Sequence, residues 1–136
     1  MIVQIRGFKA KHVIVISDSC FAGALFNEIS YRGEEIETNL EVLYGRKNKS
    51  IARVAITSGT YELVPDSVNG SDHSPFSTTL LKILESNEEI LFANNLFSEI
   101  EVGITRYSKQ TPVYGELDIN QHDQAGDFIF VPKNLR

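Results

Sequence analysis

The stretch HVIVISDSCFAG, residues 12–23, decides how the rest of the chain is interpreted. Its four consecutive β-branched residues, followed by Ser17 and Asp18, are typical of a strand buried on both faces of a parallel sheet. Three further runs have strand character, the last of them closed by a proline: 51–57, a weaker one over 111–117, and 127–131 before Pro132.

Two later stretches have helical spacing. Ser74-Pro75 supplies an N-cap and a proline in the first turn, and four apolar residues then share one face: Phe76, Leu80, Leu81 and Leu84. A second helix is expected over 95–107, with the apolar stripe Leu96, Ile100, Gly103 or Ile104, and Tyr107. A short helix just after Cys20 would carry Ala24, Leu25 and Phe26. Strands that alternate with helices predict an α/β fold with a mostly parallel sheet.

Length and composition narrow the functional classes. The chain has 136 residues, which is the size of one domain, with 42% hydrophobic and 23% charged residues, as expected for a globular protein. A net charge of −5 makes nucleic acid and anionic membranes poor partners. No apolar run reaches membrane-spanning length and the first residues do not form a signal peptide, so a cytoplasmic location is expected.

Cys20, the only cysteine, is placed where a nucleophile is favoured. It follows the first strand by three residues and precedes the expected short helix, so the thiol would lie at the carboxyl end of a parallel strand. A helix N-terminus there stabilises a thiolate, and Gly23 leaves room for a tight turn and a substrate. The alternative is a small buried hydrophobic residue, as most free cysteines are.

The segment 12–23 resembles the nucleophile segment of the caspase-like cysteine peptidases (clan CD, family C14). It is most similar to bacterial and metacaspase-type members, in which Asp-x-Cys-x-x-Gly ends a buried strand, and departs from the Gln-Ala-Cys-x-Gly form of animal caspases. Further segments resemble the family in the same order along the chain: SIARVAITSG (50–59), VPD (64–66), HSPFS (73–77), QTPVYG (110–115) and GDFIFVP (126–132). The resemblance covers nearly the whole chain and implies a three-layer fold, a mostly parallel sheet flanked by helices.

One part of the family pattern is missing. These peptidases pair the cysteine with a histidine roughly 50 residues upstream, whereas only 19 residues precede Cys20. His12 is the only histidine among them, and five extended residues place it about 17 Å away, at the opposite end of the strand. His73 and His122 are expected to be structural or exposed. Residues 1–136 therefore resemble the carboxyl-terminal portion of a single caspase-like domain, without its first strands and the segment that bears the histidine.

The resemblance also implies a basic substrate pocket. Metacaspase-type enzymes cleave after arginine or lysine, and Asp18 occupies the position that lines their pocket. An extended segment turns Asp18 and Cys20 to the same side, where the carboxylate could bind a guanidinium. Asp66 is the candidate for a second acid, with Glu62 as its alternative. Asp18 could instead cap the strand end, and Asp66 could be an ordinary turn residue; Arg53, the one plausible residue for an aspartate-specific pocket, is expected to pack structurally.

The chain divides into three parts: the nucleophile strand and helix (1–29), an exposed connecting loop (30–50), and a part that resembles the family's small subunit (51–136). The loop is acidic first and basic later, and self-cleavage is predicted after Arg46, Lys47 or Lys49. The expected partners are protein or peptide substrates and either the missing amino-terminal half or a second copy. No bound cofactor is expected, although the family resemblance allows activation by Ca²⁺.

Other interpretations stay open. A degenerate, non-catalytic caspase-like module with a binding or regulatory role would explain the missing histidine, although Cys20 and Asp18 are both present. A flavodoxin-like domain with an incidental cysteine is a third interpretation. The chain has no glycine-rich phosphate loop after the first strand, which disfavours nucleotide binding.

Overall fold

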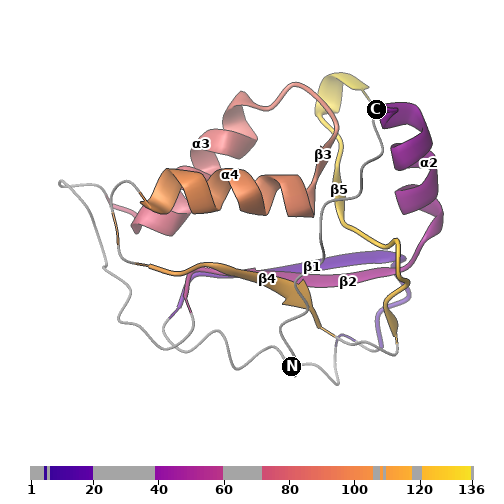
Figure 1. The fold of residues 1–136 in the computed structure, drawn as a ribbon, viewed down its shortest axis with the longest axis horizontal. Coiled ribbons are helices and arrows are strands. Elements are labelled where there is room, and N and C mark those ends of the chain that lie inside the picture. Colours follow the sequence, from indigo (N-terminus) through magenta and orange to yellow (C-terminus); the bar gives the residue numbers. More distant parts are fainter. Residues whose placement is uncertain are drawn as a thin grey trace.

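The structure is a computed structural model that describes residue 5 and residues 7–19, 39–59, 72–105, 108, 110–117 and 121–135. Within these ranges the elements follow one another as β1 (His12–Ser17), α2 (Leu40–Lys49), β2 (Ala52–Thr57), α3 (Pro75–Ser86), β3 (Leu91–Phe92), α4 (Ala93–Thr105), β4 (Val113–Glu116), β5 (Ile129–Phe130) and a 3-10 helix, η3 (Lys133–Leu135). The chain is mixed α/β, as predicted (Figure 1).

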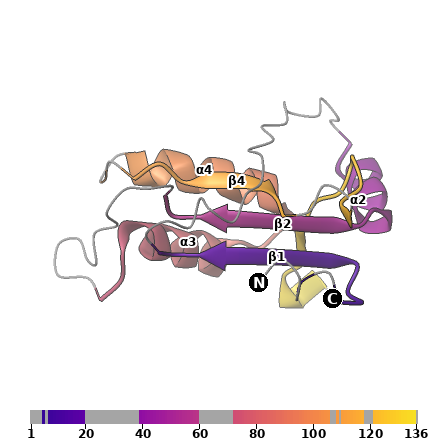
Figure 2. The same cartoon turned by 90° about the horizontal axis from the view of Figure 1, so that it is seen from below.

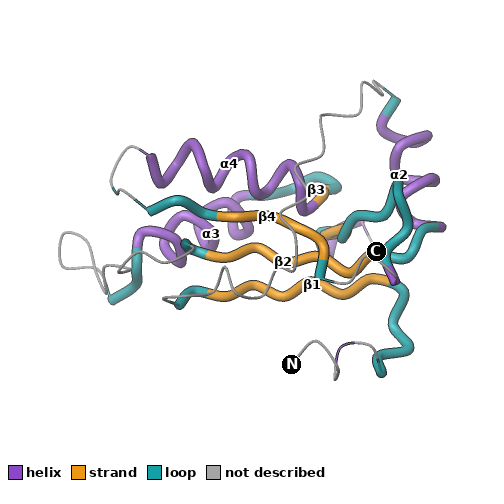
Figure 3. The backbone as a smooth tube through the Cα atoms, turned by 60° about the horizontal axis from the view of Figure 1, so that its bottom comes forward, coloured by secondary structure: helices purple, strands orange, loops and turns teal. Residues whose placement is uncertain are grey.

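The main sheet has the described strands in the order β1-β2-β4 (Figure 3). Strands β1 and β2 are parallel, with His12 opposite Ala52 and Ser17 opposite Thr57. Strand β4 runs antiparallel to β2, so only one of the two strand pairs is parallel. The predicted last strand is shorter than expected and pairs with β3 in a separate two-stranded antiparallel sheet.

Helices α3 and α4 form because their sequences supply both a start signal and an apolar face. The Ser74 hydroxyl accepts a hydrogen bond from the Ser77 backbone N–H at 3.0 Å, and Pro75 opens the helix, as predicted. The predicted face of α3 is wrong at one position. Leu81 is 41% exposed, and Ile83 packs against the core instead, because the helical period turns Leu81 away from the sheet.

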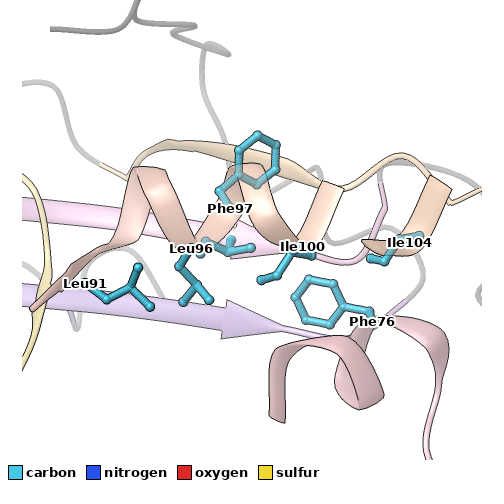
Figure 4. Packing of buried hydrophobic residues seen from close by; sticks show 7 residues of the cluster. Phe76, Leu91, Leu96, Phe97, Ile100 and Ile104 are labelled. Atoms are coloured by element: carbon cyan, nitrogen blue, oxygen red, sulfur yellow. The ribbon is translucent and has the colours of Figure 1, made fainter. Parts of the chain in front are cut away.

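The main core lies between these two helices and the sheet. Figure 4 shows side chains from α4 and from the start of α3 meeting in one cluster, whose buried members are Ile56, Phe76, Leu91, Leu96, Phe97, Ile100 and Ile104. Gly103 permits the close approach of the helices, because a Cβ at this position would lie 2.6 Å from the Thr79 Cγ2 atom. The predicted stripe of α4 is therefore confirmed at its described positions; Tyr107 lies outside the described residues.

Helices α3 and α4 lie on one face of the main sheet, and α2 lies at its end (Figures 1 and 2). The expected three-layer arrangement is thus seen as two layers in the described part of the chain, and the short helix predicted after Cys20 falls outside it. Strand β1 differs from the expected strand buried on both faces, because only Val13 is buried and the other side chains are half-buried. Among the described strands β1 pairs with β2 alone, so one of its edges has no strand beside it.

Helix α2 corrects the prediction that residues 30–50 form a connecting loop, at least over residues 40–49. Asn39 caps the helix by accepting hydrogen bonds from the backbone N–H groups of Glu41 and Val42 at 3.0 and 3.2 Å. An acidic residue lies in the first turn and the basic residues lie in the last, which complements the helix dipole. The mixed charge that suggested a solvated loop is therefore a helix-stabilising pattern. The segment 40–49 is nevertheless exposed to solvent, as predicted, since α2 buries no residue fully.

Candidate functional site

The candidate site lies where β1 and β2 end. The two strands are parallel and in register, and the Ser58 backbone N–H donates to the Ser17 carbonyl at 3.0 Å just beyond them. The first turn of α3 reaches the same place, because the hydroxyls of Ser74 and Ser77 both hydrogen-bond to Asp18, which follows β1. Carboxyl ends of parallel strands are where α/β proteins place their sites. The predicted pocket residue therefore lies at the expected edge of the sheet.

Asp18 is an exposed carboxylate oriented by two hydroxyls. Ser74 Oγ and Ser77 Oγ each donate to the same oxygen, Oδ2, at 2.5 Å, in the range of charge-assisted bonds. Ser74 also accepts the Ser77 backbone N–H, so the carboxylate is tied into the N-cap of α3. These donors are side chains from a segment 56 residues away in sequence, whereas the predicted alternative is a cap of nearby backbone N–H groups.

The remaining residues predicted for the site lie outside the described residues. This applies to Cys20, to Asp66 and to its alternative Glu62. Their arrangement around Asp18 remains a prediction, supported by the chain distance of two residues between Asp18 and Cys20.

The three histidines are in different environments. His12 begins β1, at the opposite end from Asp18, and its Nε2 hydrogen-bonds to the Ser50 carbonyl at 2.9 Å. His122 Nδ1 accepts the Arg53 backbone N–H at 3.1 Å, and its Nε2 lies 3.7 Å from Glu116 Oε1. Both histidines contact other parts of the fold, and His12 lies at the end of β1 away from Asp18, as predicted from the sequence.

His73 is the histidine that the structure brings to the site. It is exposed and immediately precedes Ser74, the residue that donates to Asp18. Its place at the site was not predicted, because nothing in the sequence relates residue 73 to residue 18. The signal that could have suggested it is the Ser74-Pro75 helix start, since a helix that follows a parallel strand begins near the sheet edge where sites lie.

Arg53 is structural, as expected. Its side chain is buried, and the two terminal guanidinium nitrogens donate to four backbone carbonyls at 2.7–3.2 Å, three of them in the segment before β1: Phe8, Ala10, Lys11 and Ala52. A guanidinium occupied in this way secures the chain that leads into β1. It does not form a pocket for an acidic substrate.

The residues predicted for self-cleavage lie in the last turns of α2 and not in an extended loop. Arg46 and Lys49 are exposed, whereas Lys47 is largely buried. Lys47 Nζ lies 3.6 Å from Asp127 Oδ2 and 5.5 Å from the centre of the Phe92 ring. The predicted connecting loop is therefore wrong at these three residues, because their charges stabilise a helix.

Asp127 is a buried carboxyl group whose importance the sequence does not indicate. Burial raises its pKa, an effect opposed by Lys47 and by hydrogen bonds from the Tyr114 hydroxyl and the backbone N–H groups of Asn94 and Phe128. Asp127 lies two residues before β5, and these contacts connect it to β4, to the first turn of α4 and to α2. In the sequence, the GDF triplet at 126–128 shows only strand character.

Four buried side-chain atoms have no hydrogen-bond partner among the described residues. They are Arg53 Nε, the Ser58 hydroxyl just after β2, and both polar atoms of the Gln110 side chain. Among the described residues no cluster of three or more histidine, cysteine or acidic side chains is arranged to hold a metal ion. In the same part of the chain no helix combines the length and apolar character needed to cross a membrane.

Comparison of the chain with protein-family models, with curated proteins and with solved structures gives no match in any of the three. A function can therefore be inferred only from the sequence and from the geometry described above.

Proposed function

We propose that the chain is the carboxyl-terminal portion of a cytoplasmic caspase-like cysteine endopeptidase that cleaves after arginine or lysine. The Cys20 thiolate would attack the scissile carbonyl carbon, and the amine would leave with a proton, giving a thioester that water then hydrolyses. A histidine supplied from outside this chain would transfer the protons. The observation that carries the proposal is Asp18, an oriented carboxylate at the carboxyl end of a parallel strand, two residues before the only cysteine.

The contacts of Asp18 suit it to bind a basic side chain. Both described hydrogen bonds fall on Oδ2, and the residue is exposed, so Oδ1 is available for a guanidinium or ammonium group. The hydroxyls of Ser74 and Ser77 restrict the rotation of the carboxylate, which lowers the entropy cost of binding. An acidic pocket of this kind favours arginine and lysine and disfavours aspartate.

Strand β1 supports the proposal that further strands complete the sheet. Its β-branched sequence is that of a central strand, yet among the described strands it is paired on one side only. An apolar edge strand promotes pairing with another chain. We therefore propose that the missing amino-terminal half, or a second copy, pairs with β1. Light scattering should show self-association of the isolated chain, and a strictly monomeric, cooperatively unfolding species at high concentration would contradict this.

A non-catalytic caspase-like module is the second candidate. The observation in its favour is that the bonds from Ser74 and Ser77 already give Asp18 a structural role, linking β1 to α3. The two candidates differ in Cys20: a binding module should keep its partners after Cys20→Ser, whereas a peptidase should lose turnover.

The proposal predicts different activities for the isolated chain and for a longer protein. The chain alone should hydrolyse peptide-coumarin substrates negligibly, because losing a general base commonly costs about 10² to 10⁴ in rate. A protein that includes the upstream coding sequence should cleave after arginine and lysine but not after aspartate, and Cys20→Ala should abolish turnover. Robust turnover by the isolated chain would show that a local group replaces the missing histidine, and His73→Ala would identify it.

Self-processing after Arg46, Lys47 or Lys49 remains part of the proposal, with one added requirement. Peptidases bind extended substrates, so helix α2 must unwind before any of these bonds is cut. Mass spectrometry of the longer protein should find cleavage at these residues, absent in Cys20→Ala and blocked by Asp18→Asn. Cleavage that persists in Cys20→Ala would assign it to another protease, and cleavage after aspartate would remove the pocket assignment.

A further inference from the structure

Helix α2 is held to the rest of the protein by little apolar contact. It buries no residue fully, and Leu40 and Val42 are about half exposed. Its outward-facing residues include Arg46 and Lys49, and its last carbonyls are contacted by Lys11, whose Nζ donates to the Asn48 carbonyl at 3.2 Å. The face of α2 that includes Leu43, Tyr44 and Lys47 is only half-buried, and a helix of this length without a fully buried face is only marginally stable by itself.

The exception is Lys47, which reaches from α2 into the protein. Its Nζ lies 3.6 Å from Asp127 Oδ2 and within 5.5 Å of the Phe92 ring centre, and both partners are buried. Asp127 is in turn fixed by the Tyr114 hydroxyl at 2.9 Å and the Phe128 backbone N–H at 2.8 Å. The ammonium of Lys47 therefore binds a carboxylate whose position is set by the body and not by α2.

We infer that the Lys47–Asp127 pair is a latch that holds α2 folded on the body, and that its opening exposes the basic end of the helix to proteolysis. A protease cuts a helix only after local unfolding, so the cutting rate follows the population of the open form. Breaking one buried ion pair leaves its partner charge uncompensated, which favours the open form. The role of the latch in self-processing rests on the proposed function. Its role in protecting α2 from other trypsin-like proteases does not depend on that function.

The test uses trypsin on the Cys20→Ala protein, so that self-processing cannot contribute. Lys47→Gln removes the latch, and Lys49→Gln is the matched control, because it removes the same charge from the same helical turn at an exposed position. The measured quantity is the rate of cleavage after Arg46, divided by the rate at which trypsin cuts the same bond in an unfolded peptide of each variant's sequence, because residue 47 directly follows that bond. We expect cleavage about tenfold faster in Lys47→Gln than in Lys49→Gln, equivalent to about 1.4 kcal/mol. Equal rates in the two variants would overturn the inference.

Amide hydrogen exchange distinguishes a latch from a general contribution to stability. In Lys47→Gln the amides of α2 should exchange about tenfold faster, while those of α3 and α4 keep their wild-type rates. Asp127→Asn should give the same local effect on α2 through the other partner. Faster exchange throughout the protein, or unchanged exchange in α2, would overturn the latch. Because neither measurement involves turnover, a failed peptidase assay leaves this result interpretable.

Discussion

Helices α4 and α2 are of similar length but are attached to the protein in different ways. Helix α4 buries five apolar residues, four of them in the main core. Helix α2 buries none fully, and its described contacts with the body include the ion pair between Lys47 and Asp127 and the hydrogen bond from Lys11 to the Asn48 carbonyl. One helix is therefore part of the core, and the other is an attachment to it.

This difference predicts two kinds of opening. Apolar burial is lost only when the core comes apart, so the amides of α4 should exchange through global unfolding. A helix held by an ion pair can detach while the core persists. The segment proposed to be cleaved should therefore open more readily than α4.

The largest expected effect comes from removing a core side chain of α4. Ile100 is fully buried among the residues of α3 and the sheet, so Ile100→Ala should lower the free energy of unfolding by about 3 kcal/mol. Val102 on the same helix is 60% exposed, and Val102→Ala should change it by less than about 0.5 kcal/mol. Urea denaturation measures both, and similar losses would show that α4 is not packed as described.

A smaller loss of stability is expected from a substitution at Gly126, where the turn before Asp127 packs against the residue that precedes β2. A Cβ on residue 126 would clash with the Ile51 carbonyl oxygen, a backbone atom that cannot rotate away. Gly126→Ala should therefore cost about 1 to 3 kcal/mol and loosen α2 as well, since Asp127 would move. Thermal denaturation and exchange in α2 measure the two effects. Wild-type values for both would mean that the turn adapts.

Gly45→Ala should stabilise the protein, in contrast to Ile100→Ala and Gly126→Ala. Gly45 lies within α2, and a methyl group added to its Cα would have no neighbouring atom within 4 Å, so alanine adds helix propensity without a clash. The gain should be up to about 1 kcal/mol and confined to α2, where exchange and trypsin cleavage should slow. Slower exchange in α3 and α4 as well would show that α2 is part of the cooperative core.

The smallest effect is the pH dependence that Asp127 contributes. Burial raises its pKa above the ordinary value of 3.8, so its protonation favours the folded state. Its contribution to stability is full below that value and is lost as the pH rises through the raised pKa. The free energy of unfolding of the wild type relative to Asp127→Asn should therefore fall as the pH rises above 3.8. A rise in this difference would mean that attraction to Lys47 outweighs burial.

Local signals in the sequence are sufficient for much of the fold. The β-branched runs that form β1 and β2, and the Ser74-Pro75 start of α3, depend on neighbours a few residues away. Helix α2 was not predicted, because its low apolar content masks its helix signals, the Asn39 cap and the order of its charges. Leu81 was placed on the wrong face because two adjacent leucines fit one stripe equally well until tertiary contacts decide.

The sequence predicts a residue of the candidate site only where a single short segment carries the whole signal. Asp18 was identified from its spacing to Cys20, whereas its bonds to Ser74 and Ser77 join segments far apart in the chain. The Lys47–Asp127 pair could not be foreseen for the same reason, since its residues are 80 positions apart. Long-range polar pairs depend on the fold and leave no periodic pattern in the sequence.

The most direct test of the proposed function is the covalent labelling of Cys20 by peptide chloromethyl ketones, followed by mass spectrometry. The longer protein, with its upstream coding sequence, is treated with two reagents that end in arginine or in citrulline, its neutral isostere. We predict alkylation of Cys20 at least about tenfold faster by the arginine reagent, a preference that Asp18→Asn abolishes. Equal labelling by both reagents, or a preference that survives Asp18→Asn, would contradict the proposal.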